Sequence, residues 1–187
     1  MRVIAGKAKG RRLFAAPGMK ARPITDRVKA SVFDILAWRL AGARCLDLFA
    51  GTGALGIEAL SRGAATAVFV ECDPRMVGVI RRNLEATSLG ELGNVMHADV
   101  RWAVRVLAGR EGPFDVVFID PPYGHGLAPV ALELVARHGL VDESGVVVVR
   151  HERRQEMPHL CANLRLVRQE GFGDTVVSFY EPGDGGG

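Results

Sequence analysis

The chain has 187 residues, of which 48% are hydrophobic, so it is long and apolar enough to bury the core of one domain, which excludes wholesale disorder. No apolar run approaches the ~20 residues that cross a bilayer, and the first residues lack the apolar region of a signal peptide. We therefore expect a soluble, cytoplasmic, monomeric protein without a membrane partner.

The net charge of +3 conceals an asymmetry along the chain. Residues 1–29 hold nine Lys or Arg and one acid, whereas the remainder holds fifteen bases and twenty acids. A segment rich in positive charge attracts a phosphate backbone. A basic segment that is merely solvated has the same composition. The candidate nucleic-acid contacts are Lys7, Lys9, Arg11, Arg12, Arg22 and Arg27.

The three cysteines, Cys45, Cys72 and Cys161, form no C-x-x-C pair and no cluster with histidine. This spacing argues against disulfides and against structural zinc, so we expect no metal. Each cysteine is expected to be a small buried apolar residue in a reducing compartment.

In chain order, the pattern first predicts two short strands, Arg2–Ile4 and Arg11–Phe14, around a glycine-rich turn. A loop with Pro17-Gly18 and Pro23 follows. Thr25 is expected to cap a helix that runs to about Leu40, because apolar residues then return at helical spacing.

From residue 44 onward, short apolar runs alternate with helical stretches. The sequence predicts strands at Arg44–Phe49, Ala67–Glu71, Asn94–His97, Phe114–Ile119 and Gly145–Arg150, with helices between them at about 54–62, 74–88, 100–109 and 127–138. Runs such as residues 115–119 are too apolar for a sheet with one wet face, so a parallel sheet covered on both sides is indicated.

The end of the chain breaks this alternation. Leu164–Gln169 and Thr175–Tyr180 predict an antiparallel hairpin. We expect an α/β fold: a doubly wound, Rossmann-like sheet with an antiparallel C-terminal hairpin and a small N-terminal β-hairpin plus helix. Its expected parts are a basic hairpin and loop at 1–24, the main domain at 25–182 and a flexible tail at 183–187.

A glycine-rich turn follows the first strand of the main domain. Gly51, Gly53 and Gly56 match the dinucleotide fingerprint, so an NAD-dependent oxidoreductase stays open at this point. Asp47 favours S-adenosylmethionine, because a carboxylate before the glycines binds the ammonium of the methionine moiety and repels a pyrophosphate. Glu71, at the end of the second strand, suits the two hydroxyls of a ribose.

Two further acids follow strand ends. Asp99 can accept a hydrogen bond from the adenine amino group or cap the next helix. Asp73 precedes a proline, which favours a helix cap over a ligand contact. The predicted S-adenosylmethionine site comprises Asp47, Phe49, Gly51, Gly53, Glu71, Cys72, Asp99 and Val100.

The motif Asp120-Pro121-Pro122-Tyr123 ends the fourth strand. An exocyclic base amine is a weak nucleophile because its lone pair is delocalised into the ring. The Asp120 carboxylate and the Pro121 carbonyl are two stiff acceptors that can hold the amine by its hydrogens and turn its lone pair toward a methyl donor. Tyr123 can stack on the base. Asp120, Pro121 and Tyr123 are therefore the predicted catalytic residues.

These motifs resemble those of the bacterial 16S rRNA guanine-N(2)-methyltransferases, the RsmD-type family. The resemblance covers almost the whole chain: residues 2–6, 9–13, 22–28, 47–56, 58–63, 120–123, 173–175 and 178–180. The segment 22–28 and the Gly-Asp-Thr tail at 173–175 are the parts specific to that family.

The resemblance implies a class I methyltransferase sheet with an antiparallel seventh strand, S-adenosylmethionine as donor, and the 2-amino group of a guanine in 16S rRNA as acceptor, within an assembling small subunit. The chain departs from the family pattern at Ile24, Ala30, Asp34 and Arg150, where Thr, Glu, Asn and Glu are common. His151 is expected to be structural.

Three other functions share parts of this pattern. An amino-methyltransferase acting on adenine in DNA or RNA, or one acting on a protein side-chain amide, would use the same catalytic motif. A non-catalytic RNA-binding module would keep the fold and the basic segment alone.

Overall fold

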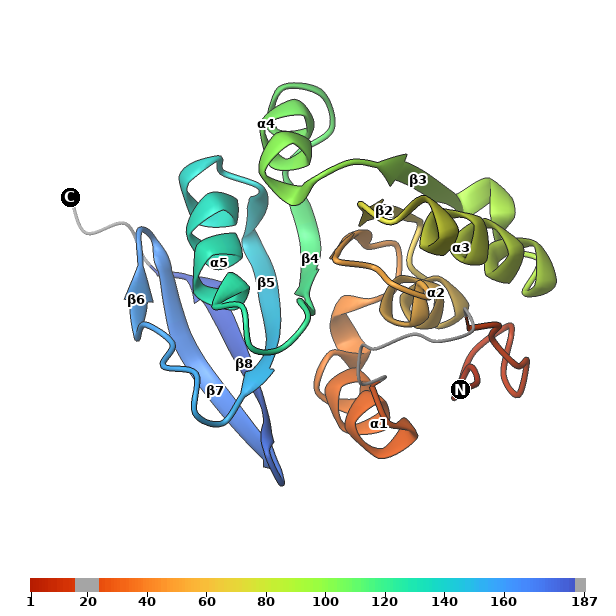
Figure 1. The fold of residues 1–187 in the computed structure, drawn as a ribbon, viewed down its shortest axis with the longest axis horizontal. Coiled ribbons are helices and arrows are strands. Elements are labelled where there is room, and N and C mark those ends of the chain that lie inside the picture. Colours follow the sequence, from red (N-terminus) through yellow and green to blue (C-terminus); the bar gives the residue numbers. More distant parts are fainter. Residues whose placement is uncertain (16–23, 184–187) are drawn as a thin grey trace.

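The computed structural model describes residues 1–15 and 24–183. One eight-stranded sheet, in the order β3-β2-β1-β4-β5-β8-β7-β6, forms its centre (Figure 1). The strands are β1 Arg44–Leu48, β2 Thr66–Glu71, β3 Gly93–His97, β4 Phe114–Ile119, β5 Val141–Glu152, β6 Leu160–Cys161, β7 Leu164–Phe172 and β8 Thr175–Pro182. The α-helices are α1 Asp26–Ile35, α2 Ala54–Ser61, α3 Pro74–Ala86, α4 Val100–Arg110 and α5 Leu127–Arg137.

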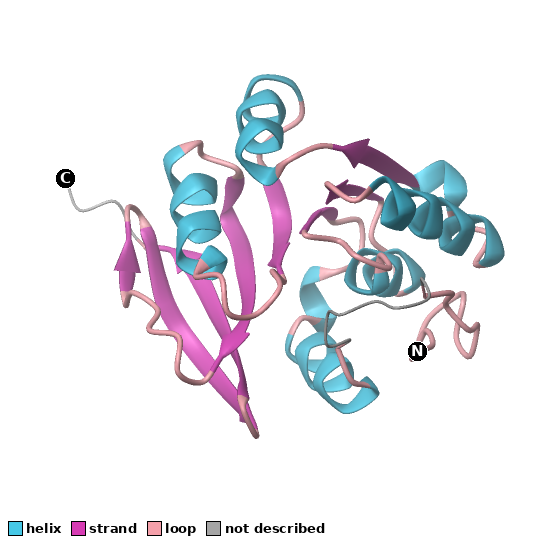
Figure 2. Ribbon diagram, in the orientation of Figure 1, coloured by secondary structure: helices cyan, strands magenta, loops and turns pink. Residues whose placement is uncertain are grey.

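The sheet has a parallel half and an antiparallel half. Strands β3, β2, β1, β4 and β5 are parallel neighbours, while β8, β7 and β6 are added antiparallel to β5 and to one another. Figure 2 shows helices packed along the parallel half. The strand order reverses direction between β1 and β4, and ligands of such folds bind at the carboxyl ends of the strands there.

Both faces of β1, β2 and β4 are buried, which explains the apolar runs. Successive residues of a strand point to opposite faces. Leu46 and Leu48 of β1 therefore join the core under α4 and α5, while Cys45 joins the core that includes residues of α1, α2 and α3.

Several element ends differ from the prediction, including one end each of β1, α1 and β5. Strand β1 ends at Leu48, because Phe49 leaves it with a positive φ of 60°. The helix capped by Thr25 ends at Ile35 instead of Leu40, and its continuation tightens into a 3₁₀ turn in which Arg39 N–H donates to the Leu36 carbonyl. Strand β5 begins at Val141, four residues before the predicted start.

The N-terminal segment, residues 1–15, is a turn closed by a single antiparallel bridge between Arg2 and Arg12. The expected hairpin thus has one bridge in place of two strands. Val3, Ala8 and Leu13 of the segment are buried in the same core as α1, α2 and α3. The predicted loop around Pro17, Gly18 and Pro23, and residues 184–187 of the predicted tail, lie outside the described residues.

Glu58 of α2 anchors the N-terminal segment to the domain. Its two carboxylate oxygens accept the backbone N–H groups of Ile4 at 2.8 Å and Ala5 at 3.0 Å. Glu58 and Lys29 are both fully buried and form an ion pair of 3.1 Å. Arg62 adds a second ion pair, at 2.9 Å. These contacts compensate the cost of burying the carboxylate.

The prediction of three buried cysteines is correct for Cys45 and wrong for Cys72 and Cys161. Cys72 is exposed and Cys161 is partly exposed. Cys72 lies one residue beyond the end of β2, where the chain has already left the buried sheet. Within residues 1–15 and 24–183, no helix is long and apolar enough to cross a membrane.

Candidate active site

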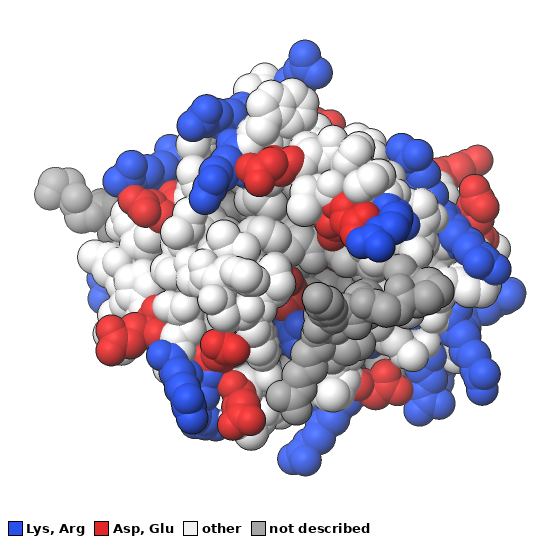
Figure 3. Space-filling model, in the orientation of Figure 1, with Lys and Arg blue, Asp and Glu red and all other residues white. Residues whose placement is uncertain are grey.

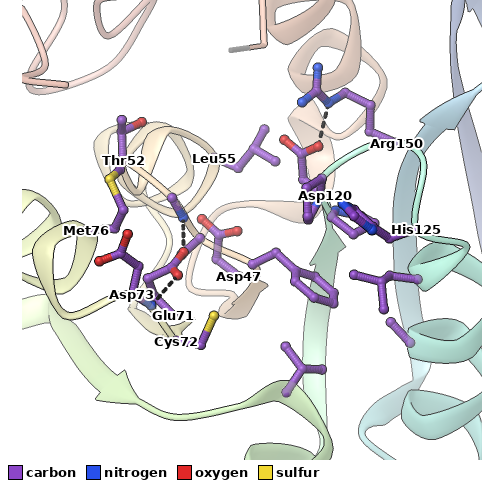
Figure 4. Close-up of a pocket in the computed structure, with 18 of the residues that line it drawn as sticks. Asp47, Thr52, Leu55, Glu71, Cys72, Asp73, Met76, Asp120, His125 and Arg150 are labelled. Atoms are coloured by element: carbon purple, nitrogen blue, oxygen red, sulfur yellow. Dashed lines mark hydrogen bonds and ion pairs between the residues drawn. The ribbon is translucent and has the colours of Figure 1, made fainter. Parts of the chain in front are cut away.

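A cavity of about 1050 Å³ opens at the carboxyl ends of β1, β2 and β4. Figure 4 shows Asp47 lying between Glu71 and Asp120 in this cavity. The cavity brings together most residues of the predicted cofactor and catalytic sites: Asp47, Phe49, Gly51, Glu71, Cys72, Asp99, Val100, Asp120, Pro121 and Tyr123. Two segments separated by some seventy residues in the sequence therefore meet at one place.

Gly53 is the predicted site residue that does not line the cavity. It is the residue before α2 and has a φ of 76°, a left-handed conformation that favours glycine. Gly56, in the first turn of α2, permits close packing, because a Cβ there would lie 2.3 Å from the ring of Phe69. The two glycines shape the turn and seat the helix on the sheet.

Asp47 is a buried carboxylate that forms no ion pair with a Lys, Arg or His side chain of the described residues. Its side chain accepts the N–H of Gly56 at 2.9 Å, and the residue is 1% exposed. Burial raises the pKa of Asp47 well above its usual range; the Gly56 hydrogen bond opposes this rise, and the charges of Asp120 and Glu71 add to it. An ammonium group bound in the cavity would relieve this carboxylate.

Glu71 is held rigidly at the rim of the cavity by two backbone groups. Its Oε2 accepts the N–H of Gly51 at 2.9 Å, and its Oε1 accepts the N–H of Asp73 at 2.8 Å. Each carboxylate oxygen has two lone pairs, so both can still accept a hydroxyl. Glu71 thus ties the glycine turn after β1 to the end of β2.

Asp73 and Asp99 both cap helices. Asp73 accepts the N–H of Arg75 at 2.9 Å at the start of α3, and Asp99 accepts the N–H of Arg101 at 2.8 Å at the start of α4. The cap role expected for Asp73 is confirmed. Asp99 also lines the cavity, so its position is compatible with both roles left open by the sequence.

Asp120 ends β4 on the other side of the cavity. Its Oδ1 accepts a hydrogen bond from Nε of Arg150 at 2.5 Å. Burial raises the pKa of Asp120, and the nearby charge and hydrogen bond of Arg150 oppose this rise. The Tyr123 hydroxyl lies 2.8 Å from Oγ1 of Thr175, which connects the loop after β4 to β8.

Arg150 is a site residue whose place the sequence analysis did not predict. It stood out only as a departure from the family pattern, thirty residues away from its partner. It also lines a second cavity, of about 290 Å³, together with Thr25 and Arg27 of the α1 start and Gly173 of the β7–β8 turn. His151, expected to be structural, is buried and bonds Oγ of Ser178 at 2.8 Å.

The predicted nucleic-acid contacts within the described residues are exposed. Lys7, Lys9, Arg11, Arg12 and Arg27 all lie at the surface, and Arg22 lies outside the described residues. In Figure 3, Lys and Arg side chains gather along the right-hand and lower edge of the molecule, where Figure 1 places the N-terminal segment and α3.

Two of the seven basic residues in 1–29 that the structure describes have internal partners. Lys29 is buried against Glu58, and Arg2 pairs with Asp26 at 3.1 Å. Asp26, which precedes Arg27 in the sequence, thus pairs with Arg2. The charge available to a partner is therefore smaller than the composition suggested.

Phe14 adds an aromatic surface to the basic segment. It is 40% exposed, and the guanidinium of Arg82 lies 3.6 Å from the centre of its ring. Asn83 accepts the backbone N–H of Phe14 at 2.7 Å and donates to the carbonyl of Thr52 at 2.9 Å. One amide thus joins the basic segment to the glycine turn of the cavity. Among the described residues, no group of three His, Cys, Asp or Glu could hold a metal ion.

Comparison with known proteins gives full-length matches. The family model described as "Conserved hypothetical protein 95" matches residues 1–181. "Ribosomal RNA small subunit methyltransferase D" of Escherichia coli is 34% identical over 181 residues, which cover 97% of this chain and 89% of the relative. YlbH of Bacillus subtilis is 39% identical over 181 residues, covering 97% and 98%. The solved structure of yhhF from Escherichia coli matches with a TM-score of 0.85 and 34% identity over 98% of both chains. The predicted fold class is confirmed.

Proposed function

The chain belongs to the family described as conserved hypothetical protein 95, and we propose that it transfers a methyl group from S-adenosylmethionine to the exocyclic 2-amino group of a guanine in 16S rRNA. A curated relative of this family carries the name of a small-subunit rRNA methyltransferase. The observation that carries the proposal is that Asp47 in β1 and Asp120 after the neighbouring strand β4 line a single cavity.

The donor fits the part of the cavity that is formed by the end of β1, the glycine turn after it and the end of β2. Asp47 offers a buried carboxylate for the donor ammonium, and Glu71 offers two fixed oxygens for the ribose hydroxyls. We assign Phe49, Gly51, Cys72, Asp99 and Val100 to the same subsite. When bound, S-adenosylmethionine supplies an activated methyl group on a sulfonium. The same cavity suits a pyrophosphate poorly, because Asp47, Glu71 and Asp120 would all repel it.

The acceptor amine is assigned to the Asp-Pro-Pro-Tyr side. Asp120 and the Pro121 carbonyl accept the two amine hydrogens, which directs the nitrogen lone pair toward the donor. Tyr123 stacks on the base. Such alignment of reacting groups can lower the barrier by roughly 7–11 kcal/mol. A target paired within a helix would first be flipped out, at a cost of a few kcal/mol.

Methyl transfer itself balances without another reactant. The nitrogen lone pair forms the new N–C bond while the C–S bond breaks and its electrons stay on sulfur. The donor leaves as the neutral thioether, and the amine loses one proton to Asp120 or to water. Asp120 is thus an orienting acceptor that can also take the proton.

The RNA is assigned to the basic side of the molecule. We propose that Lys7, Lys9, Arg11, Arg12, Arg22 and Arg27 contact its phosphates, with residues 1–24 as the RNA-contacting part and 25–182 as the methyltransferase domain. The substrate is 16S rRNA within an assembling small subunit in the cytoplasm, and the enzyme acts as a monomer.

The test is methyl transfer from labelled donor to small ribosomal subunits from a strain lacking the gene, and to deproteinised 16S rRNA, followed by nucleoside mass spectrometry. We expect one N2-methylguanosine per subunit with the wild type and only a small fraction of that label in the same time with Asp120→Ala. Label in N6-methyladenosine would show that the target base is adenine and not guanine. Absence of label from both substrates would overturn the proposal.

A further inference from the structure

Arg150 contacts two members of the Asp-Pro-Pro-Tyr motif at once. Its Nε donates to Oδ1 of Asp120 at 2.5 Å, and its guanidinium carbon lies 5.2 Å from the centre of the Tyr123 ring. The side chains of Arg150 and Asp120 are 11% and 15% exposed. Hydrogen bonds between charged groups are about twice as strong as neutral ones, and shielding from water preserves them.

The backbone on both sides of this contact is rigid. Asp120 directly follows β4, and Arg150 lies in β5, where Val149 is in register with Ile119 and Arg150 itself is in register with Val177 of β8. Adjacent, hydrogen-bonded strands therefore carry both partners. The pair can fix a side-chain position to the accuracy that a catalytic site needs.

We propose that Arg150 is a positioning residue for methyl transfer: it binds Oδ1 of Asp120 and so presents Oδ2 of this side chain to the target amine. Oδ2 of Asp120 makes no hydrogen bond with residues 1–15 or 24–183. This inference rests on the proposed function, because it assigns the amine to the Asp-Pro-Pro-Tyr side of the cavity.

Several charged or titratable groups lie around Asp120. Asp47 of β1 lines the same cavity, and the charge of Asp120 adds to the rise in the pKa of Asp47. Tyr123 and His125 line the cavity from the loop that follows Asp120, and Arg27 of α1 lines the second cavity beside Arg150.

Without Arg150, the buried carboxyl group of Asp120 would lose the cation beside it. Burial raises the pKa of Asp120, and Arg150 opposes this rise. Loss of Arg150 would therefore favour protonated Asp120. A protonated carboxyl can donate where the reaction needs an acceptor, and the amine would lose its alignment.

The experiment compares Arg150→Gln and Arg150→Lys with the wild type in the subunit methylation assay across pH. We expect kcat of Arg150→Gln at neutral pH to fall by about 10- to 100-fold, the cost of losing a hydrogen bond to a charged group. The acid limb of its profile should move to higher pH, with partial recovery of kcat in alkali. Arg150→Lys keeps the charge and should keep the wild-type limb.

Arg168→Gln is the matched control. It removes an arginine that is 52% exposed and pairs with Glu170 on β7, so its profile should equal that of the wild type. Donor affinity and thermal unfolding of each variant separate a local effect from a folding defect. A faster Arg150→Gln enzyme, or one slowed with an unmoved acid limb, would overturn the assignment.

A second readout needs no turnover. Carbon-13 NMR titration of the Asp120 carboxyl in the ligand-free protein should show a higher pKa in Arg150→Gln than in the wild type. An equal pKa in both proteins would reject the inference, even if the wild type methylates RNA. Conversely, a wild type that transfers no methyl group would reject the proposed function, while the titration still decides the role of Arg150.

Discussion

The cavity and the N-terminal segment contain side chains that are held in opposite ways. In the cavity, Asp47, Glu71 and Asp120 are each fixed by a backbone N–H or by a buried arginine. In the segment, the backbone is anchored but the side chains of Lys9 and Arg11 are exposed. Chemistry at one nitrogen needs fixed acceptors, whereas attraction to a polyanion needs charge and tolerates mobile side chains. Changes in the two regions should therefore damage different quantities.

Asp120→Ala should have the largest effect. We expect kcat to fall by about 10²- to 10³-fold, the scale for removing one preorganised electrostatic contact from a reacting centre. Donor affinity should change little, because the donor is assigned to the opposite side of the cavity. Single-turnover methylation gives the first quantity and calorimetric titration with S-adenosylhomocysteine the second. Asp115→Asn, on the same strand, is the control; equal turnover in both variants would remove Asp120 from the catalytic role.

Glu71→Ala should chiefly weaken donor binding. Loss of two fixed acceptors is expected to raise the dissociation constant of S-adenosylhomocysteine by about 10- to 100-fold. Glu91→Ala, an acid in the 3₁₀ turn before β3, serves as the control in the same titration. RNA affinity should be unchanged, and an unaltered dissociation constant would contradict the assignment of Glu71.

Replacing Lys9, Arg11 and Arg12 together by Gln should weaken RNA binding by about tenfold at moderate salt and reduce the slope of log affinity against log salt by about 0.7–0.9 per lost phosphate contact. Filter binding at several salt concentrations measures both. Replacing three exposed arginines of the opposite edge, Arg137, Arg165 and Arg168, controls for net charge. An equal loss of RNA affinity in the two triple variants would show that binding depends on net charge and not on where the basic residues lie.

Asp47→Asn should have the smallest effect of these substitutions, and its effect on the stability of the free protein should be a gain. Because burial raises the pKa of Asp47, the folded state retains a proton that the unfolded state loses, and stability is lost as pH rises above the usual carboxyl range. Asn keeps an acceptor for Gly56 without the charge. We expect about 1 kcal/mol of added stability near neutral pH, none in acid, and weaker donor binding.

Denaturant unfolding at several pH values measures this gain, with Asp99→Asn at the exposed α4 cap as the control. A destabilised Asp47→Asn protein at neutral pH would mean that the carboxylate is already compensated in the absence of ligand.

Local patterns in the sequence were sufficient to predict the parallel half of the sheet. Strand β4 was predicted at its observed bounds, because the four consecutive apolar residues 116–119 indicate a strand buried on both faces. The motifs at its end and at the end of β1 were predicted to lie together, since carboxyl ends of parallel strands share one edge. Phe49 was placed in β1, because its positive φ leaves no trace in the hydrophobic pattern.

Contacts between distant segments were beyond this reasoning. The pairing of Arg150 with Asp120 depends on the register of β4 and β5, and the anchoring of Ile4 by Glu58 depends on how the N-terminal segment folds back on α2. Neither register nor fold-back is encoded in local periodicity. The wall of the cavity also includes Met1 and Val130, which carry no motif at all.

The anchoring by Glu58 limits how this enzyme could be redirected to another RNA. Exchanging residues 1–15 for the matching piece of a distant relative would leave a buried acid and Lys29 to find new hydrogen-bond partners. A graft that keeps the backbone donors at Ile4 and Ala5, and varies only the outward side chains at positions 7, 9, 11 and 12, respects this constraint. Altered substrate choice is therefore more accessible to point changes on that surface than to the shuffling of segments.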